Sequence, residues 1–372
     1  MRFDVDGTAR SVRIRRIHME EDAGKNVHDE ALAGSRSFVD FNRGGTPLVE
    51  IVSEPDMRSG AEAAATMRTL RQILRYLDVC DGNMEEGSLR CDANVSVRQA
   101  GASALGTRTE LKNINSFRFV REAIEYEVER QVSVLESGGV ITQETRLWDT
   151  HQNKTRPMRS KEEAHDYRYF PEPDLPDLVL PPGFVDAMAL PEFPAAKERR
   201  YVRDLALSDY DARVLCEEPA VARFFEAVLA AYDRPKAVAN WVINDVLREV
   251  KASEGASTVR LTPDFARQLA ELIALVDDSV ISGNVARELL KGLAPGVSPR
   301  ALVKERGLEQ VSDASSLEPL VDELLAKHPD SVAKYKAGKT NMLGFFVGQV
   351  MKATGGKANP KLVSELVAKK LA

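Results

Sequence analysis

An alternation of apolar and polar residues runs from Leu89 to Arg98, and its polar half carries side chains that can do chemistry. With the two-residue period of a strand, positions 89, 91, 93, 95 and 97 form one apolar face. The opposite face combines basic, acidic, hydroxyl and amide groups: Arg90, Asp92, Asn94, Ser96 and Arg98. Asp and Asn are disfavoured on ordinary strands. This face therefore indicates the floor of a polar cleft, with a solvated outer face as the alternative.

Carboxylates in three other strand-like segments have the chemistry of a magnesium site. Glu21 ends the first segment, Glu50 interrupts the apolar run LVEIV, and Glu110 shares a strand face with Lys112. A carboxylate is costly to bury without a cation, so we expect these acids and Asp92 to converge from separate strands of one sheet. Mg²⁺ takes one or two carboxylates and completes its shell with water and phosphate oxygens. The alternative to a metal site is that these acids are scattered on the surface and do not contact one another.

Basic side chains are interspersed among these acids. Arg90 and Arg98 lie on the face that carries Asp92, and Lys112 follows Glu110 by two residues. Cationic groups in such a place stabilise the negative charge of a transferring phosphoryl group. The pattern therefore predicts phosphoryl chemistry beside a bound metal ion.

Other common catalytic and binding sites are absent from the sequence. It has no GxxxxGK[ST], GxGxxG, HExxH or GxSxG motif, and no kinase catalytic loop. The three cysteines, Cys80, Cys91 and Cys216, exclude a CxxC metal site and fit a reducing compartment. No run approaches the ~20 apolar residues of a membrane helix. We therefore expect a cytoplasmic protein that does not contact a membrane.

The end of the chain carries a concentrated positive charge. From Lys327 onward there are nine lysines and two acids, although the whole chain has a net charge of −6. Lysines next to glycines and a helix N-terminus are suited to phosphate backbones. The residues predicted to bind a polyanion are Lys336, Lys339, Lys352 and Lys357. A solvated, lysine-rich helix surface is the alternative.

Local patterns predict the elements that must hold these residues. Ser59 with Glu62 forms a capping box that starts one helix, and an amphipathic helix runs from Ser116 to Glu136. The first 170 residues thus predict an α+β domain with a mixed or antiparallel sheet. Its strand-like stretches are residues 12–19, 37–41, 48–52, 89–98 and 107–112, with a hairpin at 141–148 and 155–159.

The remainder of the chain is predicted to be helical. Seven of the 18 prolines lie between Pro171 and Pro194, which marks a connection out of the first domain. The stretch 295–299, with two prolines and a glycine, indicates a joint before a last small helical module. Helical patterns lie near 196–232, 235–251, 263–275 and 283–291. The predicted domains are residues 1–190, 191–298 and 299–372.

Six motifs in the first domain resemble a single protein family. They are IHMEEDAGK (17–25), NR with GTPL (42–43 and 45–48), IVSEPD (51–56), EEGSLRCDAN (85–94), ELKNINSF (110–117) and DYRYFPEPD (166–174). Together and in this order they are similar to the B subunit of the aspartyl/glutamyl-tRNA(Asn/Gln) amidotransferase, the GatB family. Two further strings, GFFVGQ (344–349) and KANP (357–360), resemble the YqeY-like tail of that family.

The resemblance implies a three-part layout and an activity. The parts are a cradle domain with the catalytic site, an all-α helical domain, and a YqeY-like tail domain that binds tRNA. Members of the family use ATP and Mg²⁺ to phosphorylate the side-chain carboxylate of misacylated Glu-tRNA(Gln) or Asp-tRNA(Asn). Ammonia then displaces the phosphate to give the amide. The ammonia is released by the amidase subunit, called A. This subunit forms a heterotrimer with the B subunit and a small C subunit.

The same resemblance implies roles for individual residues. It places metal- and phosphate-handling carboxylates at the four acids that the strand pattern selects: Glu21, Glu50, Asp92 and Glu110. Nucleotide-binding roles are expected for Arg90, Asn94 and Lys112, which lie in the same motifs. The expected catalytic set is Glu21, Asp92, Glu110, Arg90 and Lys112.

The chain departs from the family pattern at its N-terminus. The family has a further N-terminal segment, whose first strand supplies a glutamate and a histidine to the metal site, whereas this sequence opens at MRFDVDG. Two hypotheses follow: a ligase subunit that uses ATP, and a tRNA-binding or assembly subunit with an incomplete catalytic site. The sequence leaves open whether Glu-tRNA(Gln), Asp-tRNA(Asn) or both are amidated.

Overall fold

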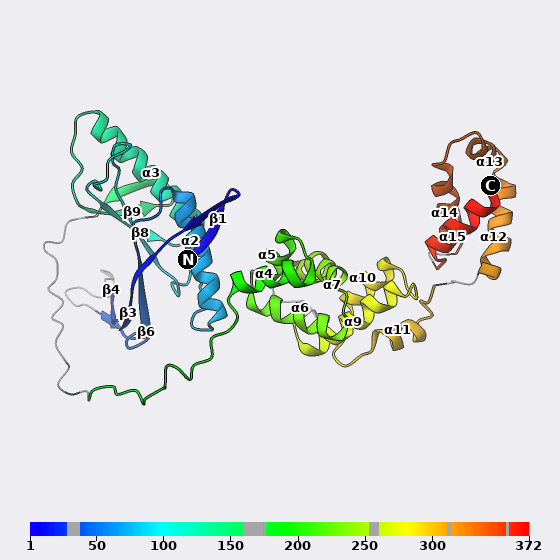
Figure 1. The fold of residues 1–372 in the computed structure, drawn as a ribbon, viewed down its shortest axis with the longest axis horizontal. Helices are drawn as coiled ribbons and strands as arrows, with labels where there is room; N and C mark the ends of the chain where they lie inside the picture. The colour runs from blue at the N-terminus through cyan, green and yellow to red at the C-terminus, as the bar shows by residue number, and fades with distance from the viewer. Residues whose placement is uncertain are drawn as a thin grey trace. The chain divides into compact units, whose positions relative to one another are not determined.

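The structure is a computed structural model of the 372-residue chain, and it describes residues 1–27, 38–158, 174, 176–252, 260–310, 314–354 and 357–371. Most of the motif at 166–174 and both glycines at 355–356 lie outside the described residues. The chain divides into two compact units, Met1–Pro191 and Glu192–Ala372, each of which is described by itself (Figure 1).

A four-stranded mixed sheet forms the centre of the first unit. Strands β8 and β9 are parallel, and the other neighbouring strands are antiparallel. Along β7 the side chains alternate between partly or fully buried and exposed, as the predicted two-residue period requires. The strands lie in the order β10 (Lys154–Pro157), β9 (Thr145–Asp149), β8 (Thr109–Ile114) and β7 (Cys91–Val95).

Strand β7 is shorter than the sequence predicts, since the chain leaves the sheet after Val95. The expectation that Arg98 shares the polar strand face is therefore wrong. Its guanidinium group lies in the following loop and donates a hydrogen bond to the Ser103 carbonyl oxygen at 2.8 Å. Arg90 likewise lies one residue before the strand begins.

The other strands in the described part of this unit form three antiparallel, two-stranded ribbons. In the longest ribbon, Glu21 lies opposite Pro47 and His18 lies opposite Glu50. The ribbons are β1 (Arg2–Val5) with β2 (Thr8–Ser11), β3 (Ile14–Glu21) with β6 (Pro47–Ser53), and β4 (Lys25–Val27) with β5 (Phe38–Asp40). The first ribbon was not among the predicted strands, although its Asp-Gly turn, with positive φ at both residues, is a strong hairpin signal.

Helices α2 (Gly60–Tyr76) and α3 (Phe117–Glu136) begin at the predicted serine caps. The Ser59 hydroxyl accepts a hydrogen bond from the Glu62 N–H at 3.2 Å. The Glu62 carboxylate reaches back to the Arg58 N–H at 2.7 Å, one residue before the cap. These contacts satisfy N–H groups that have no partner inside the first turn of a helix.

Helix α3 covers the mixed sheet, and α2 packs on α3 and on β1 (Figure 1). The core between sheet and helices includes Leu111, Val120, Ala123 and Trp148. The two helices approach closely at Gly60, where an added Cβ would lie 2.5 Å from the Arg121 carbonyl oxygen. Any larger residue at this position would force the helices apart.

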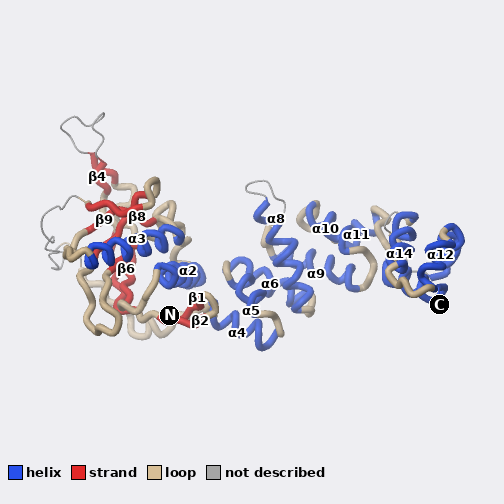
Figure 2. Tube along the Cα trace, turned by 90° about the horizontal axis from the view of Figure 1, so that it is seen from above, coloured by secondary structure: helices blue, strands red, loops and turns tan. Residues whose placement is uncertain are grey.

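The second unit is helical throughout its described part (Figure 2). Its elements are α4 (Pro194–Leu205), α5 (Asp209–Cys216), α6 (Pro219–Ala231), α7 (Pro235–Trp241), the π-helical turn η1 (Val242–Val246), α8 (Leu247–Ala252), α9 (Pro263–Asp277), α10 (Gly283–Lys291), α11 (Pro299–Glu305), α12 (Ala314–Lys327), α13 (Pro329–Lys336), α14 (Met342–Ala353) and α15 (Pro360–Leu371). In the described part of the chain, the first unit combines strands with two helices, and only helices follow after β10. This order of elements confirms the predicted α+β class.

Two separate hydrophobic cores stabilise the described part of the second unit. One contains Phe225 and Leu272, and the other contains Phe346 and Val363. Val303 of α11 is buried in the first core, so this helix packs with the helices that precede it. The predicted division at residues 190 and 298 stays a prediction. Among the described residues, no helix is long and apolar enough to cross a membrane.

Candidate functional site

Asp92, Glu110 and Lys112 meet on one face of the mixed sheet. Lys112 Nζ donates a hydrogen bond to Asp92 Oδ2 at 3.0 Å and lies 3.5 Å from Glu110 Oε1. The hydroxyl group of Thr145, at the start of β9, donates to Glu110 Oε2 at 2.8 Å. Two neighbouring strands, β7 and β8, therefore supply one charged group, which we call the lysine–carboxylate cluster (Asp92, Glu110 and Lys112), and β9 adds a hydroxyl group.

The register of β7 and β8 places Lys112 in this cluster. Asn94 lies opposite Glu110 and Ala93 opposite Leu111, and one residue further the same register brings Lys112 to Asp92. The register between β7 and β8 shifts between Cys91 and Ala93, so β8 contains one additional residue there. Asn113 adopts a left-handed conformation with φ of 65°, and its amide group donates to the Trp148 carbonyl oxygen at 3.0 Å. A bulge bends the strand, and this one directly follows Lys112, so that Ile114 rather than Asn113 lies opposite Cys91.

The cluster keeps Lys112 charged. Partial burial by itself would lower the pKa of Lys112, but the hydrogen bond to Asp92 and the charges of Asp92 and Glu110 raise it above its ordinary value. The neighbouring Cys91 thiol is neutral at physiological pH, because burial and the charge of Asp92 raise its pKa to about 12. A thiol in this state is not a nucleophile, so the chemistry of the cluster belongs to its carboxylates and its lysine.

A second charged group connects the end of β3 to the segment before β7. Arg43 Nη2 and Arg90 Nη2 each lie 2.9 Å from Asp22 Oδ2. The Nε atom of Arg90 also donates to the Gly87 carbonyl oxygen at 3.3 Å. Because Arg90 precedes Asp92 by two residues, this group lies beside the lysine–carboxylate cluster along the chain.

The structure does not gather all four predicted metal ligands. Glu50 forms an ion pair with Arg16 at 2.8 Å on the β3–β6 ribbon, and Glu21 ends β3. Within the described residues, no three Asp, Glu, His or Cys side chains lie close enough together to hold a metal ion. Asp92 and Glu110 are brought together, whereas the set of four stays a prediction. Asn94, an exposed residue of β7, lies opposite Glu110 in the register.

Sequence reasoning missed three residues that the structure places here: Asp22, Arg43 and Thr145. Asp22 and Arg43 lie inside the motifs at 17–25 and 42–48, so a signal was present, but strand periodicity selects neither. Nothing in the sequence pattern points to Thr145, because its role depends on the parallel pairing of β8 with β9.

The predicted polyanion-binding lysines lie at the two ends of α14. Lys336 and Lys339 precede this helix, Lys352 is in its last turn, and Lys357 follows it; all four are exposed. A helix of 12 residues is ~18 Å long. The four lysines therefore form two pairs rather than one cluster.

A cavity of about 550 Å³ lies in the first unit. Its lining includes Arg71, the loop at 81–85, and the segment that starts α3 at 115–117. The same loop continues along the chain to Gly87 and Arg90, which belong to the second charged group.

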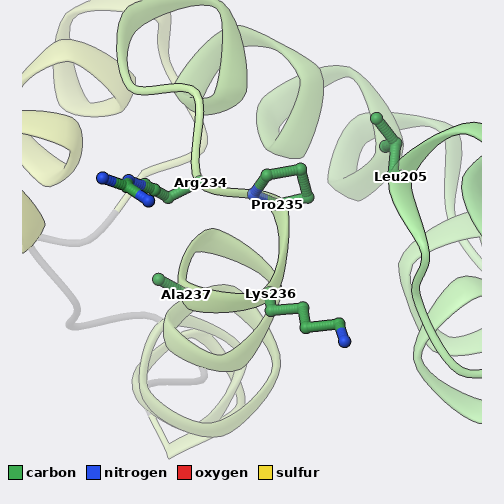
Figure 3. A pocket seen from close by; sticks show the side chains of 5 residues that line it. All are labelled: Leu205, Arg234, Pro235, Lys236 and Ala237. Atoms are coloured by element: carbon green, nitrogen blue, oxygen red, sulfur yellow. The ribbon is translucent and has the colours of Figure 1, made fainter.

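A further cavity, of about 420 Å³, lies in the second unit and contains no predicted site residue. Its cationic side chains, Arg234 and Lys236, point in different directions (Figure 3), so they offer no common binding point. The lining residues are Leu205, Arg234, Pro235, Lys236 and Ala237.

Comparison with known proteins identifies relatives over both units. The GatB/GatE catalytic domain matches residues 1–186, and the GatB domain matches residues 223–371. In Solidesulfovibrio magneticus, the B subunit of the aspartyl/glutamyl-tRNA(Asn/Gln) amidotransferase is 53% identical over 371 residues, which cover 99% of this chain and 77% of that relative. The same protein of Myxococcus xanthus is 51% identical over 374 residues, which cover 99% of this chain and 77% of the relative. This chain is similar to those proteins over nearly its whole length.

Proposed function

The chain belongs to the GatB family, the B subunits of the aspartyl/glutamyl-tRNA(Asn/Gln) amidotransferase, and on that premise we propose that it activates and amidates an aminoacyl group carried by tRNA. It is thus a subunit of a carbon–nitrogen ligase. The proposed substrates are Glu-tRNA(Gln), Asp-tRNA(Asn) or both, together with ATP. The observation that carries the proposal is the meeting of Asp92, Glu110 and Lys112 on one face of the sheet.

The proposed reaction has two steps, because a carboxylate resists ammonia until one of its oxygens becomes a good leaving group. First, a carboxylate oxygen of the substrate bonds to the γ-phosphorus of ATP, and ADP leaves. Ammonia then bonds to the carbonyl carbon while phosphate leaves and a proton is lost. Lys112 is held charged by its two acids, and guanidinium groups are charged at all physiological pH values. Lys112 and Arg90 therefore neutralise charge on phosphoryl oxygens.

The carboxylate pair fits a magnesium ion by its donor chemistry. Asp92 and Glu110 lie 3.0 and 3.5 Å from a cationic atom, Lys112 Nζ, so the pair is arranged around positive charge. One or two carboxylates are the usual protein contribution to a Mg²⁺ site with phosphate ligands. We propose Asp92 and Glu110 as the protein ligands of an ion that neutralises phosphate charge, and Glu21 and Glu50 stay candidates.

An exposed apolar stretch in the first unit supports assembly with other proteins. Contiguous exposed apolar surface is typical of protein–protein contacts. We propose a cytoplasmic heterotrimer with the amidase, or A, subunit, which supplies ammonia, and the small C subunit. The exposed side chains of this stretch are Leu178, Val179, Leu180, Phe184, Val185, Met188 and Leu190.

The alternative, a tRNA-binding or assembly subunit without chemistry, is not favoured. The relatives match 99% of this chain. The lysine–carboxylate cluster is also present in the part of the chain that the structure describes. A subunit that only binds tRNA has no need for two carboxylates around one lysine.

The test is ATP-dependent formation of Gln-tRNA(Gln) from Glu-tRNA(Gln) by the heterotrimeric complex, supplied with glutamine and Mg²⁺. Asp92→Asn is expected to lower the rate by roughly 100-fold, the order seen when one group that stabilises transition-state charge is removed. Asp56→Asn is the matched control, because Asp56 forms an ion pair with Arg13 at 2.7 Å outside the cluster. An Asp92→Asn complex that works at the normal rate would contradict the proposal.

A further inference from the structure

Thr145 holds one of the two oxygens of the Glu110 carboxylate. Its hydroxyl group donates a hydrogen bond to Oε2 at 2.8 Å, whereas Oε1 lies 3.5 Å from Lys112 Nζ. The first distance is that of a well-formed O–H···O hydrogen bond, and the second is longer than the usual range for N–H···O. Thr145 therefore restrains the Glu110 carboxylate more closely than Lys112 does.

The backbone of Thr145 is held on both sides by the sheet. Thr145 lies opposite Glu110 in the parallel register of β8 and β9, and the Glu110 N–H donates to the Glu144 carbonyl oxygen at 3.0 Å. On the other side, the Thr145 carbonyl oxygen accepts from the Met158 N–H at 2.9 Å. Threonine is β-branched, which restricts its χ1 angle. The sheet thus places the hydroxyl group, and the carboxylate adapts to it.

The Glu110 side chain needs such a restraint. A glutamate loses much rotamer freedom when it is ordered, and this side chain is 35% exposed, so packing does not enclose it. Lys112 is shared, because its closer partner is Asp92, at 3.0 Å. The hydrogen bond from β9 therefore sets the direction in which Glu110 faces the rest of the lysine–carboxylate cluster.

We propose that Thr145 is a positioning residue, which holds Glu110 in the orientation that ligates a divalent cation; the inference rests on the proposed function. Carboxylates that ligate metal ions are themselves hydrogen-bonded, and the loss of such a partner typically costs roughly 10–100-fold in metal affinity or activity. A hydroxyl group suits this role because it is a neutral donor. It orients the carboxylate without a positive charge that would repel the ion.

The experiment is a titration of the full chain with Mn²⁺ as a substitute for Mg²⁺, followed by the electron paramagnetic resonance signal of the free ion. Thr145→Val retains the volume, the β-branch and the strand propensity of threonine, but it removes the donor. It is expected to weaken Mn²⁺ affinity by roughly tenfold or more. In the complex, it is expected to raise the Mg²⁺ concentration for half-maximal amidation by a similar factor.

Thr145→Ser separates positioning from a structural role, because serine keeps the hydroxyl group and loses only the methyl group. It is expected to restore most of the Mn²⁺ affinity. Thr142→Val is the matched control, since Thr142 is an exposed threonine that precedes β9, and its Mn²⁺ affinity is expected to equal that of the wild type. A thermal melt verifies that each variant is folded.

Three results would overturn the inference. They are wild-type Mn²⁺ affinity in Thr145→Val, an equal loss in Thr145→Ser and Thr145→Val, and no Mn²⁺ binding by the wild-type chain. If the complex amidates tRNA but Thr145→Val binds Mn²⁺ normally, only the inference about Thr145 fails. If Thr145→Val loses Mn²⁺ affinity but the wild-type complex forms no amide, the proposed function fails and the positioning of Glu110 stands.

Discussion

Asn113 shows how one backbone conformation positions a charged side chain. A φ of 65° is rarely adopted by residues other than glycine, although asparagine tolerates it better than most. The Asn113 amide also holds the Trp148 carbonyl oxygen at 3.0 Å. This conformation forms the bulge that directly follows Lys112 in β8. Its strain is therefore linked to the site rather than to a turn between elements.

The bulge predicts opposite results for two substitutions at this position. Asn113→Gly is expected to retain amidation, because glycine adopts the same φ and loses only one hydrogen bond, worth about 1 kcal/mol. Asn113→Val is expected to lose roughly 2 kcal/mol or more of stability and most of the activity, because a β-branched residue resists positive φ. Urea unfolding and the amidation assay measure both effects. Equal activity of the two variants would contradict this account.

At the scale of elements, α3 is tied to the sheet by a buried carboxylate. Glu127 is fully buried; it accepts from Arg130 Nη2 at 2.7 Å and from the Thr155 hydroxyl group of β10 at 3.1 Å. Gln131, one turn further along α3, donates to the Val95 carbonyl oxygen of β7 at 3.1 Å. The helix that covers the face of the sheet opposite the cluster is thus fastened to both edge strands of the sheet.

Glu127 also makes the stability of the first unit depend on pH. Burial by itself would raise the pKa of Glu127, but hydrogen bonds from Arg130, Gln131 and Thr155 and the charge of Arg130 lower it below the ordinary 4.5. A folded-state pKa below the unfolded value gives stability that is present above pH 4.5 and is lost as the pH falls through the folded-state pKa.

Glu127→Gln is expected to cost roughly 3 kcal/mol at pH 7, since it removes the buried carboxylate that the half-buried Arg130 contacts at 2.7 Å. It is also expected to reduce the fall in stability as the pH drops below 4.5. Trp148 fluorescence during urea unfolding, in a Trp241→Phe background, reports on the first unit because these are the two tryptophans of the chain. Glu129→Gln, at an exposed position of α3, is the control. An unchanged pH slope in Glu127→Gln would refute the linkage.

At the scale of the whole molecule, the charge of the chain is divided between its parts. The overall net charge is −6, while nine lysines follow position 326. Some of these lysines are already paired: Lys370 with Asp322 at 2.7 Å, and Lys327 with Glu323. The pairs at the two ends of α14 have no such partner among the described residues. They are the lysines that we propose to contact tRNA phosphates.

Replacing Lys336, Lys339 and Lys352 with Ala together is expected to weaken tRNA binding and to flatten its salt dependence. Each lost phosphate contact lowers the slope of log affinity against log salt by roughly 0.7–0.9, so the triple variant is expected to lose about two units of slope. Filter binding at several salt concentrations measures it. Lys327→Ala with Lys370→Ala serves as the control, because both lysines already have acidic partners. An unchanged slope in the triple variant would show that these lysines do not face tRNA.

The sequence by itself determined the features that depend on neighbours along the chain. Serine caps at positions 59 and 116 begin helices because their hydroxyl groups reach N–H groups three residues away. The alternation along β7 and the α+β class also follow from local periodicity. The family motifs added the relationship to GatB, which the comparisons confirm.

Only the tertiary structure decided which distant residues meet. Asp22 and Arg90 are 68 residues apart in sequence, and their contact depends on how the β3–β6 ribbon lies against the segment before β7. Lys112 reaches Asp92 because β7 and β8 pair in the register that sets Asn94 opposite Glu110, and Thr145 reaches Glu110 because β9 pairs with β8 in parallel. Periodicity assigns a side chain to a face of its own strand, but the packing of separate strands decides what lies across from it.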